Sequence, residues 1–213
     1  MRESISLSNV KKFNRNFNSS STNTLSRNAL IQNDASKVAV SWENFSQINH
    51  IYSNTISKQL PVTNQKASGR CWGFAGLNLL RLEIVKKYNL SNFEFSQNYF
   101  MFWDKLEKAN YFLENILKTL DQDYDSRVMM HLLQAPVQDG GQWDMFVNLI
   151  EKYGVVPQSV MPESFQSSQS RMMNRFLTRK LREFAWTLRS MSDKGSKISD
   201  LRRIKKSMMS TIY

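Results

Sequence analysis

The sequence predicts a mainly helical globular protein. Seven glycines and four prolines among 213 residues amount to about 5%, against roughly 12% in an average protein. So few chain-breaking residues favour helices and disfavour a turn-rich β-sandwich. Hydrophobic residues make up 41% of the chain and charged residues 22%, which is ordinary globular usage and argues against wholesale disorder. The length allows one or two domains with a sizeable core.

The first part of the chain is polar and interrupted. Two short helices are expected at about 5–17 and 22–32, separated by a cluster of Asn and Ser residues. Residues 36–70 show no helical periodicity and are expected to be extended and looped. The sequence therefore predicts an N-terminal helical arm, residues 1–35, followed by one main domain, residues 36–213.

A central helix is expected from Cys71, where an apolar run begins that continues to Val85. Because this run is apolar nearly all round, the helix is expected to be buried. The next helix, 96–120, begins at the N-capping residue Ser96. Its expected apolar face consists of Tyr99, Phe102, Trp103, Leu106, Leu113, Leu117 and Leu120. Further helices are expected at about 126–134, 142–153, 168–191 and 197–213. The aromatic residues Trp72, Trp103 and Trp143 are expected in the core.

The last expected helix, 197–213, is amphipathic and has no stop signal before the final residue. Its apolar residues recur at intervals of three or four and form one stripe: Ile198, Leu201, Ile204, Met208 and Ile212. No segment of the sequence is evident as a cover for this stripe, so we expect it to be exposed. A helix that still runs at the last residue also suggests a truncated chain.

The net charge of +11 is concentrated in one stretch of the chain. Between Arg171 and Lys206, twelve basic residues stand against three acidic ones, so this stretch carries +9 and the other 177 residues only +2. Arg171, Arg175, Arg179 and Arg182 share one helical face. Such a face binds the phosphates of nucleic acid without sequence preference, and no base-reading motif accompanies it. The alternative is an ordinary solvated surface.

Cys71, the only cysteine, is a candidate nucleophile. It opens the expected buried helix, where free N–H groups and the helix dipole stabilise a thiolate. Gln65 lies six residues earlier, across a loop that contains Gly69. Its side-chain amide can fold back beside the sulfur and, with the Cys71 N–H, donate to a developing oxyanion. Taken alone, a single thiol is more often a buried structural residue.

A family resemblance changes this balance. The nucleophile segment of papain-like cysteine peptidases is similar to residues 61–75, PVTNQKASGRCWGFA. The similarity is specifically to the bleomycin hydrolase and aminopeptidase C branch. Two further blocks resemble that branch in the same order, EFSQNYFMFWDK at 94–105 and DGGQWDMFV at 139–147. The resemblance extends from about residue 20 to the end of the chain.

The resemblance implies a papain-like α+β fold, of which this chain supplies mainly the helical Cys-bearing domain with helical insertions. It implies a cysteine aminopeptidase that cleaves peptide N-termini through an acyl-thioenzyme, without a metal or an organic cofactor. Cys71 would be the nucleophile and Gln65 an oxyanion-hole donor, while Gly140 and Gly141 would line the cleft and let a peptide substrate approach the backbone. The assembly that the resemblance implies for the full-length form is a homo-hexamer with a basic central channel.

The chain departs from the family pattern at the catalytic base. A thiolate peptidase needs a His to protonate the leaving amine and an Asn or Asp to orient it. Papain-like chains place that His about 130–150 residues after the Cys, but residues 201–213 contain none, and His50 and His131 do not match. We therefore expect an incomplete, N-terminal half of such an enzyme that is inactive alone. The competing interpretations are a non-catalytic remnant and a basic module that binds nucleic acid or another partner.

Cysteine usage and hydropathy bear on the cellular location. A single cysteine forms neither an intramolecular disulfide nor a cysteine-rich zinc site, so we expect no metal centre and a reducing, cytoplasmic location. The N-terminus has no apolar signal segment, and no later stretch approaches the about 18 uninterrupted apolar residues of a membrane span. Neither secretion nor membrane insertion is expected.

Overall fold

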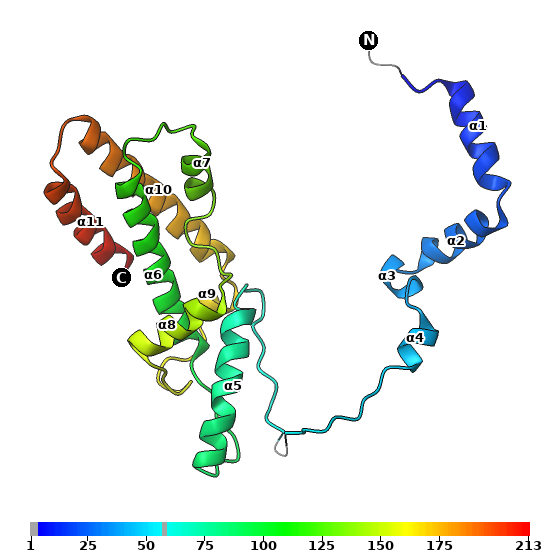
Figure 1. The fold of residues 1–213 in the computed structure, drawn as a ribbon, viewed down its shortest axis with the longest axis horizontal. Helices are drawn as coiled ribbons and strands as arrows, with labels where there is room; N and C mark the ends of the chain where they lie inside the picture. Colours follow the sequence, from blue (N-terminus) through cyan, green and yellow to red (C-terminus); the bar gives the residue numbers. More distant parts are fainter. Residues whose placement is uncertain (1–3, 57–58) are drawn as a thin grey trace. The chain divides into compact units, whose positions relative to one another are not determined.

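The computed structural model describes residues 4–56 and 59–213. Contacts within the chain separate it into two units, Met1–Lys58 and Gln59–Tyr213. Figure 1 shows the helices of both units. All regular structure in the described residues is helical, apart from one isolated antiparallel bridge between Phe95 and Pro157. No helix among these residues is long and apolar enough to cross a lipid bilayer.

Within residues 4–56, the described part of the first unit, four helices form and no side chain is buried. The helices are α1 (Leu7–Asn18), α2 (Ser21–Gln32), α3 (Ala35–Val38) and α4 (Trp42–Ser46). Each begins after a Ser or Asp side chain that accepts a backbone N–H of the first turn. The two longer helices confirm the sequence prediction. α3 and α4 correct the expectation of a wholly looped segment, because helices of four and five residues are too short to show apolar periodicity.

The second unit contains seven helices. They are α5 (Cys71–Lys87), α6 (Gln97–Lys118), α7 (Arg127–Gln134), α8 (Trp143–Tyr153), α9 (Phe165–Ser168), α10 (Arg171–Asp193) and α11 (Ile198–Ile212). All but the four-residue α9 were predicted from the sequence. This content matches the expected helical Cys-bearing domain, and the described residues contain no sheet that would form the β part of the fold.

One core of the second unit, the aromatic cluster, packs α5, α6 and α8 together. Its buried members are Leu77, Phe95, Phe100, Phe146 and Leu149. The helices approach closely because α5 presents glycines to the rings. A Cβ added to Gly73 would lie 2.4 Å from the Phe100 ring, and one added to Gly76 would lie 2.5 Å from the Phe146 ring. These contacts fix the position of α5, the helix that begins at Cys71.

The other core, the aliphatic cluster, joins α6, α7, α10 and α11. Its buried members are Ala109, Phe112, Leu113, Ile116, Leu117, Met129, Val137, Leu181, Phe184, Ala185, Leu188, Leu201 and Met208. Figure 1 shows α6, α10 and α11 side by side. The expectation of an uncovered last helix is therefore wrong. Leu201 and Met208 are buried, and Ile204 and Ile212 pack against the same cluster, while Ile198 stays exposed.

α6 reaches both clusters, which explains why its predicted apolar face is only partly correct. The helix begins at Ser96 as predicted, with the Ser96 hydroxyl accepting the Tyr99 N–H at 2.9 Å. Leu113 and Leu117 are buried as expected. Near the start of the helix, however, Phe100 is buried and Tyr99 is only half-buried. A helix that serves two differently placed cores does not present a single stripe of 3.6-residue period.

Candidate active site

Cys71 lies at the exposed N-terminus of a helix that is otherwise packed against a core. It is the first residue of α5, and its side chain is exposed. No side chain caps this end, and within residues 59–213 the N–H groups of Cys71, Trp72 and Gly73 have no acceptor. The first backbone bond runs from the Phe74 N–H to the Arg70 carbonyl at 3.0 Å. Free N–H groups and the positive end of the helix dipole therefore lie beside the thiol.

Gln65 belongs to a tight turn just before α5. Its Nε2 donates to the Ser68 carbonyl at 2.7 Å, and the Ser68 hydroxyl donates back to the Gln65 carbonyl at 2.7 Å. Within the turn, Lys66 has a φ of 55°, in the left-handed region that residues other than Gly, Asn and Asp seldom occupy. A side-chain amide carries two N–H groups. One N–H of Gln65 is therefore left over for another acceptor.

Arg70, the residue directly before Cys71, binds Glu163 in the segment after α8. Its guanidinium makes hydrogen bonds of 2.8 and 2.9 Å to the Glu163 carboxylate, a two-point geometry that fixes orientation as well as distance. Arg70 is 3% exposed. Burial raises the pKa of Glu163, but hydrogen bonds from Arg70, Ser167 and Ser168 outweigh it and hold the pKa below its ordinary value. The chain just before Cys71 is therefore anchored to Glu163 by an ion pair in which both side chains are charged.

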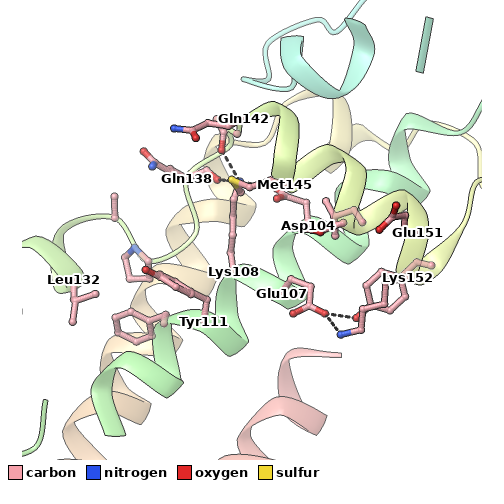
Figure 2. Close-up of a pocket in the computed structure, with 18 of the residues that line it drawn as sticks. Asp104, Glu107, Lys108, Tyr111, Leu132, Gln138, Gln142, Met145, Glu151 and Lys152 are labelled. Carbon is pink, nitrogen blue, oxygen red and sulfur yellow. Dashed lines mark hydrogen bonds and ion pairs between the residues drawn. The ribbon is translucent and has the colours of Figure 1, made fainter. Parts of the chain in front are cut away.

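Lys108 of α6 holds the loop that carries Gly140 and Gly141. Its Nζ donates at 2.8 Å to each of three acceptors: the Gln138 carbonyl, the Gly140 carbonyl and the Asp104 carboxylate. Figure 2 shows the Lys108 side chain extending from α6 to this loop. Because all three N–H groups of the ammonium have acceptors, none is left to donate to a ligand. Lys108 therefore stabilises the glycine loop.

Asp139, the residue before the two glycines, collects donors from several elements. Its carboxylate accepts from Lys105 Nζ at 2.6 Å, Ser170 Oγ at 2.5 Å, Asn174 Nδ2 at 2.7 Å and the Gly69 N–H at 3.0 Å. Burial raises the pKa of Asp139, but these hydrogen bonds outweigh it and bring the pKa far below its usual range. The carboxylate is therefore ionised at neutral pH.

Trp72 connects the glycine loop to α5. Its Nε1 donates to the Asp139 carbonyl at 2.8 Å, and a Cβ on Gly141 would lie 2.5 Å from its ring, whereas Gly140 has no atom within 4 Å of that position. Within residues 59–213 the Gly141 N–H and C=O have no hydrogen-bond partner. The structure therefore places the predicted cleft glycines against the residue that follows Cys71, with one backbone unit unpaired.

A cavity of about 1210 Å³ adjoins the glycine loop, between α6, α7 and α8 (Figure 2). Gly140, Gly141 and the exposed His131 line it, whereas Cys71 and Gln65 do not. The cavity therefore shares a wall with the predicted cleft but does not contain the thiol.

No histidine of residues 59–213 is a hydrogen-bond partner of Cys71, whose thiol makes no hydrogen bond in that range. His131 lies on α7, and His50 is exposed in the first unit. The structure thus places Gln65 on the turn before Cys71 and Gly141 beside Trp72, and brings no imidazole of the second unit to the sulfur.

Two other expectations need correction. Trp143 is 61% exposed and is not a core residue, whereas Trp72 and Trp103 pack against the aromatic cluster as expected. The basic stretch is partly structural. Arg182 is exposed, but it donates to the carbonyls of Leu133 and Gln134 at the end of α7, so part of its guanidinium binds that helix end.

Other basic side chains of this stretch also have partners. Arg189 is buried and donates to the carbonyls of Thr119 and Gln122, and Lys205 pairs with Glu114 at 2.5 Å. Arg171, Arg175 and Arg179 are exposed and have no hydrogen-bond or ion-pair partner in residues 59–213. Arg189 and Lys205 are therefore not part of an exposed cationic surface, whereas Lys194, Lys197 and Lys206 are exposed like the three arginines.

Sequence reasoning did not assign a role to the polar residues that hold the site together: Lys105, Asp139, Glu163, Ser170 and Asn174. Lys105 and Asp139 lie inside the blocks that resemble the peptidase branch, and an Asp directly before two glycines was an available signal. Ser170 and Asn174 carry no such signal, because a single Ser or Asn near the start of a helix has many ordinary roles.

Comparison with known proteins agrees with this architecture. Residues 4–213 match the Peptidase C1-like family. Cysteine proteinase 1, mitochondrial, of Saccharomyces cerevisiae is 45% identical over 193 residues, which is 89% of this chain and 40% of the yeast protein. Aminopeptidase C of Listeria monocytogenes is 47% identical over 185 residues, 87% of this chain and 39% of its own length. Bleomycin hydrolase of Oryctolagus cuniculus is 45% identical over 167 residues, 77% and 60% respectively.

A solved structure shows the same fold. The crystal structure of PepW from Lactobacillus rhamnosis HN001 matches with a TM-score of 0.91 and 41% sequence identity, covering 100% of this chain and 48% of that one. This chain therefore spans between 39% and 60% of the length of these relatives. The matches confirm the papain-like fold and the resemblance to the bleomycin hydrolase and aminopeptidase C branch, and the chain belongs to the Peptidase C1-like family.

Proposed function

We propose that this chain carries the nucleophile and the oxyanion-binding groups of a cysteine-type aminopeptidase that acts on peptide N-termini. One observation carries the proposal: the exposed Cys71 thiol lies at an uncapped helix N-terminus, directly after the turn that holds the Gln65 amide. Relatives named cysteine proteinase, aminopeptidase C and bleomycin hydrolase support the same class of reaction.

In the proposed reaction the Cys71 thiolate attacks the carbonyl carbon of the first peptide bond. The carbonyl electron pair moves to oxygen, and the Cys71 N–H and the remaining Gln65 N–H donate to this oxyanion. The C–N bond breaks, the amine leaves with a proton, and an acyl-thioenzyme remains that water hydrolyses. The unpaired backbone of Gly141 would hold the substrate in an extended conformation, beside Gly140. No metal or organic cofactor takes part in this scheme.

The leaving amine must receive a proton, which an imidazole normally supplies. Since no histidine of residues 59–213 contacts Cys71, we propose that the chain alone is acylated but does not turn over peptide amides. An aryl ester separates the two requirements, because p-nitrophenolate leaves as an anion and needs no proton.

The test is acylation of the full chain by an aminoacyl p-nitrophenyl ester, followed by nitrophenolate release and by intact mass. We expect a single burst of nitrophenolate and one acyl group on Cys71, with none on a Cys71→Ser variant. The same chain unfolded in urea is the control, and it should be acylated about 100-fold more slowly because it lacks the oxyanion donors. Equal rates for the folded and the unfolded chain would overturn the proposal.

An aminoacyl amide tests the missing base. We expect no turnover that depends on Cys71. Turnover at ordinary enzyme rates would show that the chain contains its own base, and the variants His50→Ala and His131→Ala would then identify it.

A second candidate function is non-specific binding of nucleic acid by the basic stretch 171–206. It is favoured by Arg171, Arg175 and Arg179, which are exposed and unpaired within residues 59–213. Fluorescence anisotropy with labelled DNA would test it, and binding should fall steeply between 50 and 200 mM salt, values typical of phosphate contacts. Absence of binding at about 50 mM salt would exclude this role.

Assembly and location complete the proposal. The family resemblance supports a homo-hexamer in the full-length form, which native mass spectrometry of that form would test. A cytoplasmic location is also a proposal, since the yeast relative is named mitochondrial, and cell fractionation would decide between the two compartments.

A further inference from the structure

Residue 139 contacts the chain on both sides of Cys71. Before the cysteine, the Gly69 N–H donates to Asp139 Oδ2 at 3.0 Å, and after it, the Trp72 indole N–H donates to the Asp139 carbonyl at 2.8 Å. The first contact is also tight, because a Cβ on Gly69 would lie 2.8 Å from the Asp139 Cβ. The cysteine lies between these two contacts, and Gly140 follows Asp139 directly.

The Asp139 carboxylate is itself fixed by two helices that do not contain Cys71. Lys105 of α6 donates to Oδ1 at 2.6 Å, as does Asn174 of α10 at 2.7 Å, while Ser170, just before α10, donates to Oδ2 at 2.5 Å. Lys105 is 5% exposed and Ser170 is 2% exposed. A carboxylate held in this way offers the Gly69 N–H an acceptor whose position does not depend on the loop before Cys71.

We infer that Asp139 is a positioning residue for acylation: it holds the Gly69 backbone before Cys71 and the Trp72 side chain after it against the loop that carries Gly141. The role presupposes the acyl transfer proposed above. It differs from the role of Gln65 and of the Cys71 N–H, which would touch the substrate, because Asp139 acts only through Gly69 and Trp72.

Asp139→Asn is a more specific test than truncation to Ala. The four groups that donate to the carboxylate differ in whether they can also accept a hydrogen bond from the new amide. Ser170 can rotate its hydroxyl and accept, and Asn174 can flip its amide, whose Oδ1 is buried without a partner. The Lys105 ammonium and the Gly69 N–H can only donate. An Asn at 139 therefore keeps its oxygen toward the buried ammonium and turns its NH2 toward the Gly69 N–H. The variant breaks the contact with the Gly69 N–H and keeps a hydrogen bond from the Lys105 ammonium, which no longer faces a negative charge.

The experiment compares two reagents for Cys71 in the full chain. Iodoacetamide requires only an accessible thiolate, whereas the aminoacyl p-nitrophenyl ester also requires the oxyanion donors in place. For Asp139→Asn we expect the ester rate constant to fall about 10- to 100-fold, as misplacement by about 1 Å does, and the iodoacetamide rate constant to change less than about 3-fold.

The matched control is Glu114→Gln. Like Asp139→Asn, this variant removes a carboxylate that binds a mostly buried lysine, because Glu114 of α6 pairs with Lys205 at 2.5 Å. Glu114 touches no residue of the loop before Cys71. Both of its rate constants should match the wild type. If Asp139→Asn fails to fold, Trp72→Phe removes the indole N–H to Asp139 together with the part of the ring that contacts Gly141, and it should show the same selective loss of ester reactivity.

Two outcomes would overturn the inference. One is a fall of both rate constants by the same factor in Asp139→Asn or Trp72→Phe, and the other is no change in either. Failure of the wild type to be acylated refutes the proposed function, and amide hydrogen exchange at Gly69 then decides the positioning role. Exchange at Gly69 should become at least 10-fold faster in Asp139→Asn, about one order of magnitude for a lost hydrogen bond, and equal rates would refute that role as well.

Discussion

The aromatic cluster and the aliphatic cluster share α6 but are built differently. In the aromatic cluster and the adjoining glycine loop, backbone and ring meet without an intervening side chain: a Cβ on Gly73, Gly76 or Gly141 would lie 2.4 to 2.5 Å from an aromatic ring. The helices of the aliphatic cluster, α6, α7, α10 and α11, contain no glycine and meet through Leu, Ile, Met and Ala side chains together with Phe112 and Phe184.

This difference separates two tasks within one unit. Ordinary side-chain packing in the aliphatic cluster supplies stability, and it adjusts partly when a side chain changes. The ring–glycine contacts fix where α5 begins, and a backbone next to a ring has no side chain that can move aside. Substitutions on the two sides should therefore affect stability and Cys71 reactivity in different proportions.

The largest expected effect on stability is on the aliphatic side. Leu113 is fully buried, so Leu113→Ala removes apolar contacts and leaves a cavity, which should lower the free energy of unfolding by about 2–5 kcal/mol. Urea unfolding followed by circular dichroism measures this loss. The ratio of the ester to the iodoacetamide rate constant at Cys71 should equal that of the wild type under native conditions. A changed ratio would show that the two clusters are not separable.

Gly73→Ala tests the aromatic side. The new methyl would lie 2.4 Å from the Phe100 ring, and overpacking of this kind costs about 1–3 kcal/mol, more than the about 1 kcal/mol that Ala gains over Gly in a helix. We expect lower stability in urea and a reduced ester-to-iodoacetamide ratio at Cys71. The matched control is Gly140→Ala, whose methyl meets no atom within 4 Å and should change stability by less than about 0.5 kcal/mol.

Much of the fold could be predicted from local signals. Ser96 and Ser126 have the capping role that their positions before apolar runs indicate. Gly154 ends α8 with a φ of 72°, as expected for a glycine after the last apolar residue. The partner of the last helix was missed, because an amphipathic stripe shows that a cover is needed and not which segment provides it.

The candidate site divides in the same way. The positions of Cys71, Gln65, Gly140 and Gly141 follow from motifs that a resemblance makes visible. The anchors do not, since Arg70 meets a carboxylate 93 residues away in the sequence and Asp139 collects donors from separate helices. Hydrogen bonds between distant side chains leave no periodicity in a sequence, so only the folded structure shows them.

Glu163→Gln tests whether these anchors matter for stability. The pKa of Glu163 is lowered from its ordinary 4.5, so its stabilising contribution is fully present above about pH 4.5 and is lost as the pH falls through the lowered folded-state pKa. The variant should be less stable by about 1.5–3 kcal/mol at neutral pH, the range for a hydrogen bond to a charged group. Because Gln does not titrate, its stability should fall less steeply on acidification than that of the wild type.

Urea unfolding at several pH values between about 3 and 7, on either side of the ordinary Glu value, measures this difference. Glu83→Gln is the control, since Glu83 is exposed and makes no hydrogen bond within residues 59–213, and its acid dependence should match the wild type. Parallel curves for Glu163→Gln and the wild type would contradict the anchoring role of the pair with Arg70.

The smallest effect is expected for an exposed ion pair on the aromatic side. Lys152 of α8 pairs with Glu107 of α6, and their side chains are 62% and 32% exposed. Lys152→Ala should lower the free energy of unfolding by about 0.2–1 kcal/mol, because Tyr153 still donates to Glu107 and water solvates both charges. In 1 M salt, where the screening length is about 3 Å, the loss should nearly vanish. The Cys71 rate-constant ratio should stay at its wild-type value, since this pair touches neither a ring–glycine contact nor Asp139. A larger loss of unfolding free energy that persists in salt, or a changed rate-constant ratio, would mean that the α6–α8 contact itself positions the site. The ring–glycine contacts would then not suffice to explain how α5 is fixed.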